Sequence, residues 1–196
     1  MQFDVATLLA QWAAGGLAFC WVTTRRREVG LGYGWLLRIS FGALAALSLV
    51  AGFGDGGAGA VIRNTGTALM VAGAALALAV SYVRRDRGIE GFPPWLDLVG
   101  PAFGLLGLFG AASFVGGDYA LSIARLLVGA LFLGAVSDAM LLGHWYLVQP
   151  GLGRDPIREL VKAVAILWPF ELVVWLIPTG MVSVINRHHR RRLTTV

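Results

Sequence analysis

Six apolar segments, each long enough to cross a lipid bilayer, constrain this chain more than any other feature. A helix needs roughly 20 apolar residues to cross a hydrocarbon core about 30 Å thick. The segments lie near residues 5–24, 35–54, 64–83, 95–116, 119–148 and 157–185. We therefore predict an all-α, polytopic integral membrane protein with six transmembrane helices.

The composition agrees with lipid as the solvent. Only 14% of the residues are charged, whereas soluble domains have about a quarter. We expect one transmembrane helical domain over residues 1–186, followed by a basic tail over 187–196. Nearly all basic residues are arginine, a bias typical of a GC-rich bacterial genome, so the expected location is a bacterial inner membrane, that is, a multi-pass protein of the cell membrane. The single cysteine, Cys20, excludes an intrachain disulfide and a cysteine-based metal site.

Basic clusters orient the predicted helices. Short cytoplasmic loops carry an excess of Lys and Arg, and the clusters occur in alternate loops. The loops predicted to be cytoplasmic are 25–34, 84–94 and 149–158, with the N-terminus outside. The tail is also basic, although six crossings would place it outside. Because Pro169 and Pro178 interrupt the last segment, a broken or re-entrant segment is the alternative to a simple crossing.

A weak internal repeat groups the helices in pairs. Residues 17–36 and 78–96 share apolar positions, an aromatic-Val step, an arginine cluster, a glycine and a closing Trp-Leu pair. This similarity favours three helical hairpins, each turning at a basic cytoplasmic loop. The alternative is that aromatic residues and arginines at membrane edges look alike everywhere.

Small residues mark the predicted packing faces. Helices in lipid associate through close backbone approach, which small side chains permit. Gly100, Gly104 and Gly107 lie on one face of the fourth segment, and Ala130 and Gly134 lie on one face of the fifth. A neighbouring helix of the same chain and a partner chain are both possible occupants of these strips.

Two acids lie deep in the apolar segments. Asp138 continues the strip of Ala130 and Gly134, about 16 Å from Gln149 by helical rise. Glu171 lies about 13 Å beyond Lys162, which we expect at the cytoplasmic interface. Intramembrane acids are costly and usually functional. We therefore predict a shared proton or cation site near the middle of the membrane; the alternative is two buried carboxyls that serve packing alone.

His144 is assigned to the membrane interface. It lies about 7 Å from the cytoplasmic end and on a different helix face from Asp138, beside aromatic residues. A proton relay toward Asp138 is the alternative role. Bis-histidine haem ligation would need a second intramembrane histidine, and the other two, His188 and His189, lie in the tail. No cofactor and no metal site are expected.

Three further charges lie at the predicted helix edges. Arg38 and Asp97 begin the second and fourth helices at the cytoplasmic edge, and Arg125 begins the fifth at the outer edge. Long basic side chains at such positions commonly extend to the aqueous interface. Arg125 neutralising Asp118 or Asp55 is the alternative.

The sequence contains no catalytic or nucleotide-binding motif that we could identify, so we do not expect an enzyme. The basic loops should attract anionic lipid headgroups, and the lack of a soluble basic domain argues against nucleic acid. Two functions fit: a proton- or cation-coupled carrier of a small solute, and an accessory or scaffold subunit in a homo-oligomer or larger membrane complex. The intramembrane acids favour the carrier.

Overall fold

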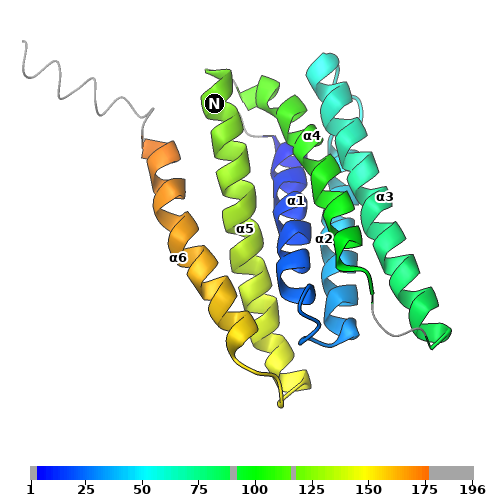
Figure 1. Cartoon of the computed structure of the whole chain (residues 1–196). Helices are drawn as coiled ribbons and strands as arrows, with labels where there is room; N and C mark the ends of the chain where they lie inside the picture. Colours follow the sequence, from blue (N-terminus) through cyan, green and yellow to red (C-terminus); the bar gives the residue numbers. More distant parts are fainter. Residues whose placement is uncertain (1–3, 89–91, 116–117, 177–196) are drawn as a thin grey trace, which may run out of the picture.

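The computed structural model describes residues 4–88, 92–115 and 118–176, which form helices throughout and no strand in those ranges. Within these ranges, six α-helices and one short 3-10 helix follow each other (Figure 1). They are α1 (Val5–Thr24), α2 (Leu31–Ala51), α3 (Ala58–Asp86), η1 (Pro94–Leu98), α4 (Val99–Val115), α5 (Tyr119–Val148) and α6 (Asp155–Leu176). The predicted all-α class is confirmed.

Among the described residues, five stretches are long and apolar enough to cross a membrane: α1, α2, α3, α5 and the combined stretch of η1 and α4. The described part of α6 is not among them, because it carries Glu159, Lys162 and Glu171 within the last 18 residues of the helix. The chain is therefore built as a multi-pass membrane protein, and the sixth crossing stays a prediction. Pro178 and the basic tail lie outside the described residues.

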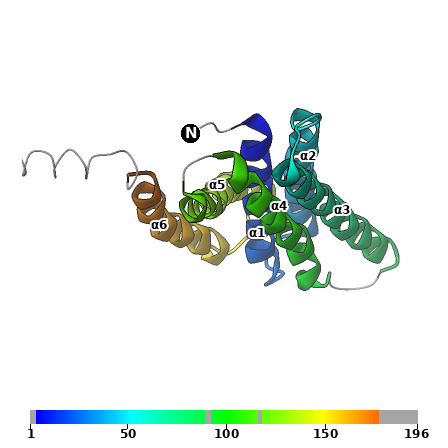
Figure 2. The same cartoon turned by 90° about the horizontal axis from the view of Figure 1, so that it is seen from above.

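The helices pack around α1. It contacts α2, α4 and α5 along its length, while α3 packs against α2 and α4 (Figure 2). α6 lies at the edge of the bundle against α5. Helices that follow each other in the sequence are therefore in contact. However, α1 also contacts α2, α3, α4 and α5, so these helices form one bundle. The grouping into three separate hairpins stays a prediction.

Glycines set the closest helix contacts. A Cβ added at Gly73 would lie 2.9 Å from the backbone nitrogen of Gly100, and one added at Gly66 would overlap the backbone of Gly107. Real Cβ atoms do not approach backbone this closely, so α3 and α4 meet backbone to backbone. This is the contact that small residues permit between helices in lipid.

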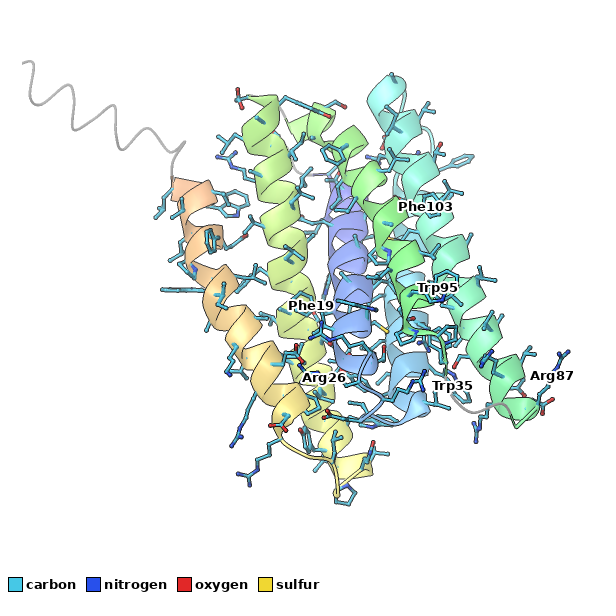
Figure 3. All side chains as sticks on the ribbon, viewed as in Figure 1. Phe19, Arg26, Trp35, Arg87, Trp95 and Phe103 are labelled. Atoms are coloured by element: carbon cyan, nitrogen blue, oxygen red, sulfur yellow. The ribbon has the colours of Figure 1, made fainter. Side chains whose placement is uncertain are left out.

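The three basic loops lie at one end of the bundle. The α1–α2 and α5–α6 connections and the C-terminal end of α3 lie at the lower end in Figure 1, and Figure 3 shows Arg26 and Arg87 toward that end. The α2–α3 connection, the C-terminal end of α4 and the N-terminal end of α5 lie at the other end. If the basic end is cytoplasmic, as the arginine excess predicts, the N-terminus is outside.

Cysteine labelling checks this orientation. Asp86 and Gly56 are both exposed and lie at opposite ends of α3, and the native Cys20 is fully buried. A membrane-impermeant maleimide should label the Gly56→Cys variant in intact cells and the Asp86→Cys variant only after permeabilisation. The reverse pattern would invert the orientation of the whole chain.

Candidate functional site

Asp138 lies in the middle of the protein interior. Asp138 is 0% exposed and lies on the face of α5 that contacts α1 and α2. The hydroxyl of Tyr33, in the first turn of α2, donates a short hydrogen bond to Oδ1 of Asp138 and lies 3.0 Å from the Asp138 backbone oxygen. The Tyr33 ring is itself fully buried and packs on Trp145 of α5, with 5.6 Å between ring centroids. The Asp138 carboxyl is thus held from one side by a neutral donor.

The second oxygen of the same carboxyl is different. Oδ2 of Asp138 is buried and has no hydrogen-bond partner of ordinary geometry within the described part of the chain. The Thr23 hydroxyl of α1 also interacts with this carboxyl, but it lies within 3.1 Å of the carbonyl oxygens of Phe19 and Cys20 on its own helix. Buried polar atoms in folded proteins are nearly always paired, so an unpaired one at this depth calls for an explanation. A proton on Oδ2 would remove the charge that is costly to bury here.

A buried ion pair lies on the other side of α1. Arg38 of α2 holds Asp97 of η1 through two parallel hydrogen bonds, 2.7 Å from Nε to Oδ1 and 2.8 Å from Nη2 to Oδ2. Both side chains are only 2% exposed. The Thr24 hydroxyl lies 3.0 Å from Oδ2 of Asp97. The planar fork of arginine matches a carboxylate in this two-point geometry, which makes such pairs the strong ones.

Cys20 connects the two groups. Its side chain is 0% exposed, contacts Thr24, and lies within electrostatic range of Asp97, Arg38 and Asp138. These side chains form what we call the inner polar cluster: Cys20, Thr23, Thr24, Tyr33, Arg38, Asp97 and Asp138. It runs from the basic end of the bundle toward its centre, in a protein whose other buried residues are mostly apolar.

Glu171 lies on α6, outside the inner polar cluster. Trp175, one turn along α6, donates a 2.8 Å hydrogen bond to Oε1 of Glu171, and Oε2 is buried without a hydrogen-bond partner among the described residues. Oε1 lies 3.7 Å from the position of a Cβ added at Gly129. A cavity of about 330 Å³ surrounds this carboxyl between α1, α5 and α6, and Gln11 and Phe132 also line it.

The two acids are separated by a close contact of α1 with α5. Gly15, at the middle of α1, meets the backbone of Ala130 and Gly134 so closely that neither Gly15 nor Gly134 has room for a Cβ. Asp138 lies four residues beyond Gly134, about 6 Å toward the basic end. Glu171 lies level with Gly129, so about 13 Å of helix separates it from Asp138.

The sequence-based expectation of one shared site therefore does not match this arrangement. The depth of Glu171 was counted from Lys162, but α6 begins at Asp155, seven residues earlier. Glu171 is consequently about 24 Å from the start of α6, whereas Asp138 is about 15 Å from the end of α5. The acids lie on opposite sides of the bundle centre and face different neighbours.

The small-residue strips face helices of the same chain. Gly100 and Gly107 lie against α3, as described above, and a Cβ added at Gly104 would lie 2.8 Å from both Ala14 of α1 and Met70 of α3. Ala130 and Gly134 lie against Gly15 of α1. These residues therefore make close contacts with helices of the same chain.

His144 is exposed near the basic end of α5, and its ring Nδ1 lies 2.8 Å from the carbonyl oxygen of Met140 on the same helix. Among the described residues, it forms no hydrogen bond or ion pair with Asp138 or Glu171. This position suits an interfacial anchor, while the relay role would require a connection to Asp138 that this geometry does not provide.

Sequence reasoning missed the partners of the buried charges. The sequence predicts separate interfacial positions for Arg38 and Asp97, whereas the two side chains pair with each other. Arg125 extends inward to the carbonyl oxygen of Val174, 2.9 Å away, and its guanidinium lies over the Trp175 ring. The sequence places Arg38 and Asp97 at the same membrane edge of two predicted helices. This placement suggests an ion pair only if the two helices are assumed to be neighbours.

The arrangement places a buried carboxyl near the polar side chains that lie between it and the basic end. Ionisable side chains at such depth commonly mark proton or ion pathways. No family model matches this chain, and neither a curated protein nor a solved structure is significantly similar to it.

Proposed function

We propose that the protein is a multi-pass carrier of the cell membrane that couples the movement of a small solute to the binding of a proton at Asp138. The observation that carries this proposal is the unpaired Oδ2 of a fully buried carboxyl. A carboxyl kept only for packing specificity is expected to have both oxygens satisfied, because each unmet acceptor costs about 1–3 kcal/mol. An oxygen without a donor leaves a position at which a proton can bind.

The inner polar cluster supports the direction of proton entry. Thr24, Cys20 and Asp97 extend from the basic end to the neighbourhood of Asp138. Glu171 offers a second carboxyl, with its own cavity, on the other side of the contact between Gly15 and Gly134. In this proposal the contact between α1 and α5 is the barrier, and its rearrangement exposes the two carboxyls alternately.

The carrier explains more of the described residues than the accessory or scaffold subunit does. The scaffold hypothesis relied on glycine strips that bind partner helices, and those strips pack within the chain. It assigns no role to the open carboxyl oxygen. An enzyme is not proposed.

Proton flux into proteoliposomes tests the proposal. An internal pH dye would report flux driven by gradients of small cations and small organic solutes. The Asp138→Asn variant keeps an acceptor for the Tyr33 hydroxyl but cannot exchange a proton, so solute-dependent flux should fall at least about tenfold. Asp86→Asn, at an exposed position near the end of α3, is the matched control and should behave as the wild type.

The thermal stability of each variant must accompany the flux. A folded Asp138→Asn protein with wild-type flux would exclude Asp138 as the proton site. If the wild-type protein shows no flux with any solute while Asp138→Asn is as stable as the wild type, the accessory role replaces the carrier.

A further inference from the structure

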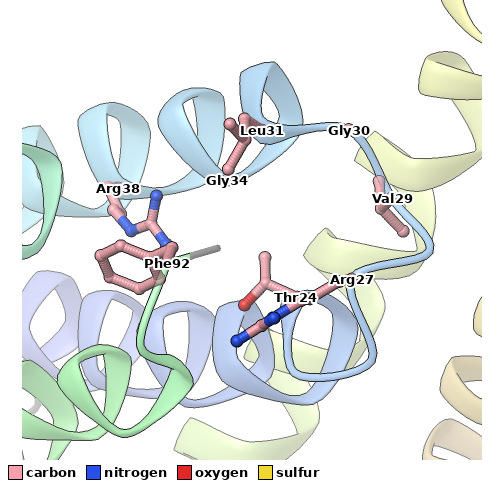
Figure 4. A pocket seen from close by; sticks show the side chains of 8 residues that line it. All are labelled: Thr24, Arg27, Val29, Gly30, Leu31, Gly34, Arg38 and Phe92. Atoms are coloured by element: carbon pink, nitrogen blue, oxygen red, sulfur yellow. The ribbon is translucent and has the colours of Figure 1, made fainter. Parts of the chain in front are cut away.

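A cavity of about 280 Å³ opens at the turn between α1 and α2, next to the inner polar cluster (Figure 4). Val29, Leu31 and Phe92 provide apolar walls, and two guanidinium groups, those of Arg27 and Arg38, lie on its lining. Small-molecule sites have about this character, mostly apolar with a few placed polar groups, although this one is at the small end of their usual range.

Arg38 presents a free donor to this cavity. Its Nε and Nη2 are used by Asp97, and its guanidinium stacks 4.3 Å from the centre of the Phe92 ring. Its Nη1 is buried and has no hydrogen-bond partner among the residues described, and the residue as a whole is 3% exposed. The nearest wall is Gly34, where an added Cβ would lie 3.0 Å from Nη1. A side chain at Gly34 would therefore crowd the unpaired Nη1.

Arg27 supplies a positive charge that pairs with no acid among the described residues. Arg25 and Arg26 both pair with Glu159 of α6, whereas Arg27 forms no ion pair in the described ranges. Figure 4 shows the Arg27 side chain running beside Thr24 at the cavity. Asp97 already neutralises Arg38, so among the described lining residues Arg27 is the charged side chain left without an ion pair. The cavity suits a monoanion better than a dianion.

We propose that this cavity binds the carboxylate group of a small, largely apolar monocarboxylic acid. One carboxylate oxygen accepts from Nη1 of Arg38 and the other from the Arg27 guanidinium, while the apolar body lies against Val29, Leu31 and Phe92. Charge-assisted hydrogen bonds from arginine are the strong and geometrically specific kind. The claim that this acid is the solute of the carrier rests on the proposed function. The claim that the acid binds in this cavity does not depend on that function.

Equilibrium binding to the purified full-length chain in a neutral detergent tests the site. Radiolabelled benzoate should bind saturably and should be displaced by octanoate. Benzamide and benzylamine, which keep the ring but replace the anion by a neutral or cationic group, should not compete. If both compete as well as unlabelled benzoate does, the cavity recognises the ring alone and the proposal is wrong.

Two variants link binding to this cavity. Arg27→Gln removes a positive charge, and Gly34→Ala places a methyl group against Nη1 of Arg38 without touching the ion pair with Asp97. Each should weaken benzoate binding at least about tenfold, the usual worth of a hydrogen bond to a charged group. Arg87→Gln and Gly42→Ala are the controls: Arg87 is an exposed arginine at the same end, and a Cβ at Gly42 meets only an ordinary contact 3.7 Å away.

Unchanged binding in folded Arg27→Gln and Gly34→Ala proteins would overturn the proposal. Displacement of benzoate by phosphatidylglycerol but not by octanoate would also overturn it, because the occupant would then be a lipid phosphate. Oleate in mixed micelles, tested beside octanoate, distinguishes a membrane-derived acid from a water-soluble one.

The binding and flux experiments fail separately. Asp138→Asn should still bind benzoate with wild-type affinity. Saturable binding without proton flux would remove the carrier and leave the carboxylate site in place. Proton flux without benzoate binding would remove the carboxylate site and leave the carrier in place.

Discussion

Replacing Asp97 by asparagine is expected to destabilise the bundle by about 3–5 kcal/mol, the usual cost of leaving one member of a buried ion pair alone. Arg38 and Asp97 are each only 2% exposed at the side chain, so water cannot solvate the remaining guanidinium. An asparagine oxygen would accept one of the two hydrogen bonds but would not balance the charge. Equilibrium unfolding in mixed detergent micelles, followed by tryptophan fluorescence, measures the loss.

The Asp97→Leu/Arg38→Met double variant is the informative comparison. Replacing both partners of a buried ion pair by apolar residues is often neutral or stabilising. The double variant should therefore be more stable than Asp97→Asn, although it lacks both charges. If Asp97→Asn instead unfolds like the wild type, the pair does not hold η1 against α2.

A single methyl group at Gly15 should have a similarly large effect. A Cβ there would overlap the backbone carbonyl of Ala130, and backbone atoms of a packed helix cannot turn aside as a flexible side chain can. We expect Gly15→Ala to lose about 3 kcal/mol or more, at or above the upper end for overpacked cores. The same unfolding measurement applies.

Gly143→Ala is the matched control for Gly15→Ala. Gly143 lies within α5, and a Cβ added there meets no other atom within 4 Å. Without a steric cost, alanine should be neutral or should stabilise the helix by up to about 1 kcal/mol. Equal effects of the two substitutions would show that Gly15 does not define the separation of α1 and α5.

The helical class could be predicted from the sequence because it depends on the length and hydropathy of single segments. The strip leading to Asp138 was visible for the same reason, since positions four residues apart share one helix face. Each of these inferences needs only one helix at a time.

The partners of Asp138 could not be predicted in this way. Tyr33 lies in a glycine-rich stretch that resembles a turn, and its role depends on α2 lying beside α5 at the basic end. The separation of Asp138 from Glu171 depends on the offset between α5 and α6, which is fixed by where the loop ends and by packing across Gly129. The hydropathy pattern of the sequence does not predict the offset between α5 and α6.

Arg63 has a consequence for the order in which the chain assembles. Its side chain is completely buried in α3 and pairs with Asp55, at 2.5 Å, and with Asp4, the N-cap of α1, at 2.9 Å. Asp55 is made only eight residues before Arg63, so these two charges can enter the membrane region as a local pair. Asp4 is made first and must wait for the third helix to arrive before it gains its basic partner. During synthesis, which proceeds from the N-terminus, the N-terminal end of α1 is therefore completed only when α3 docks.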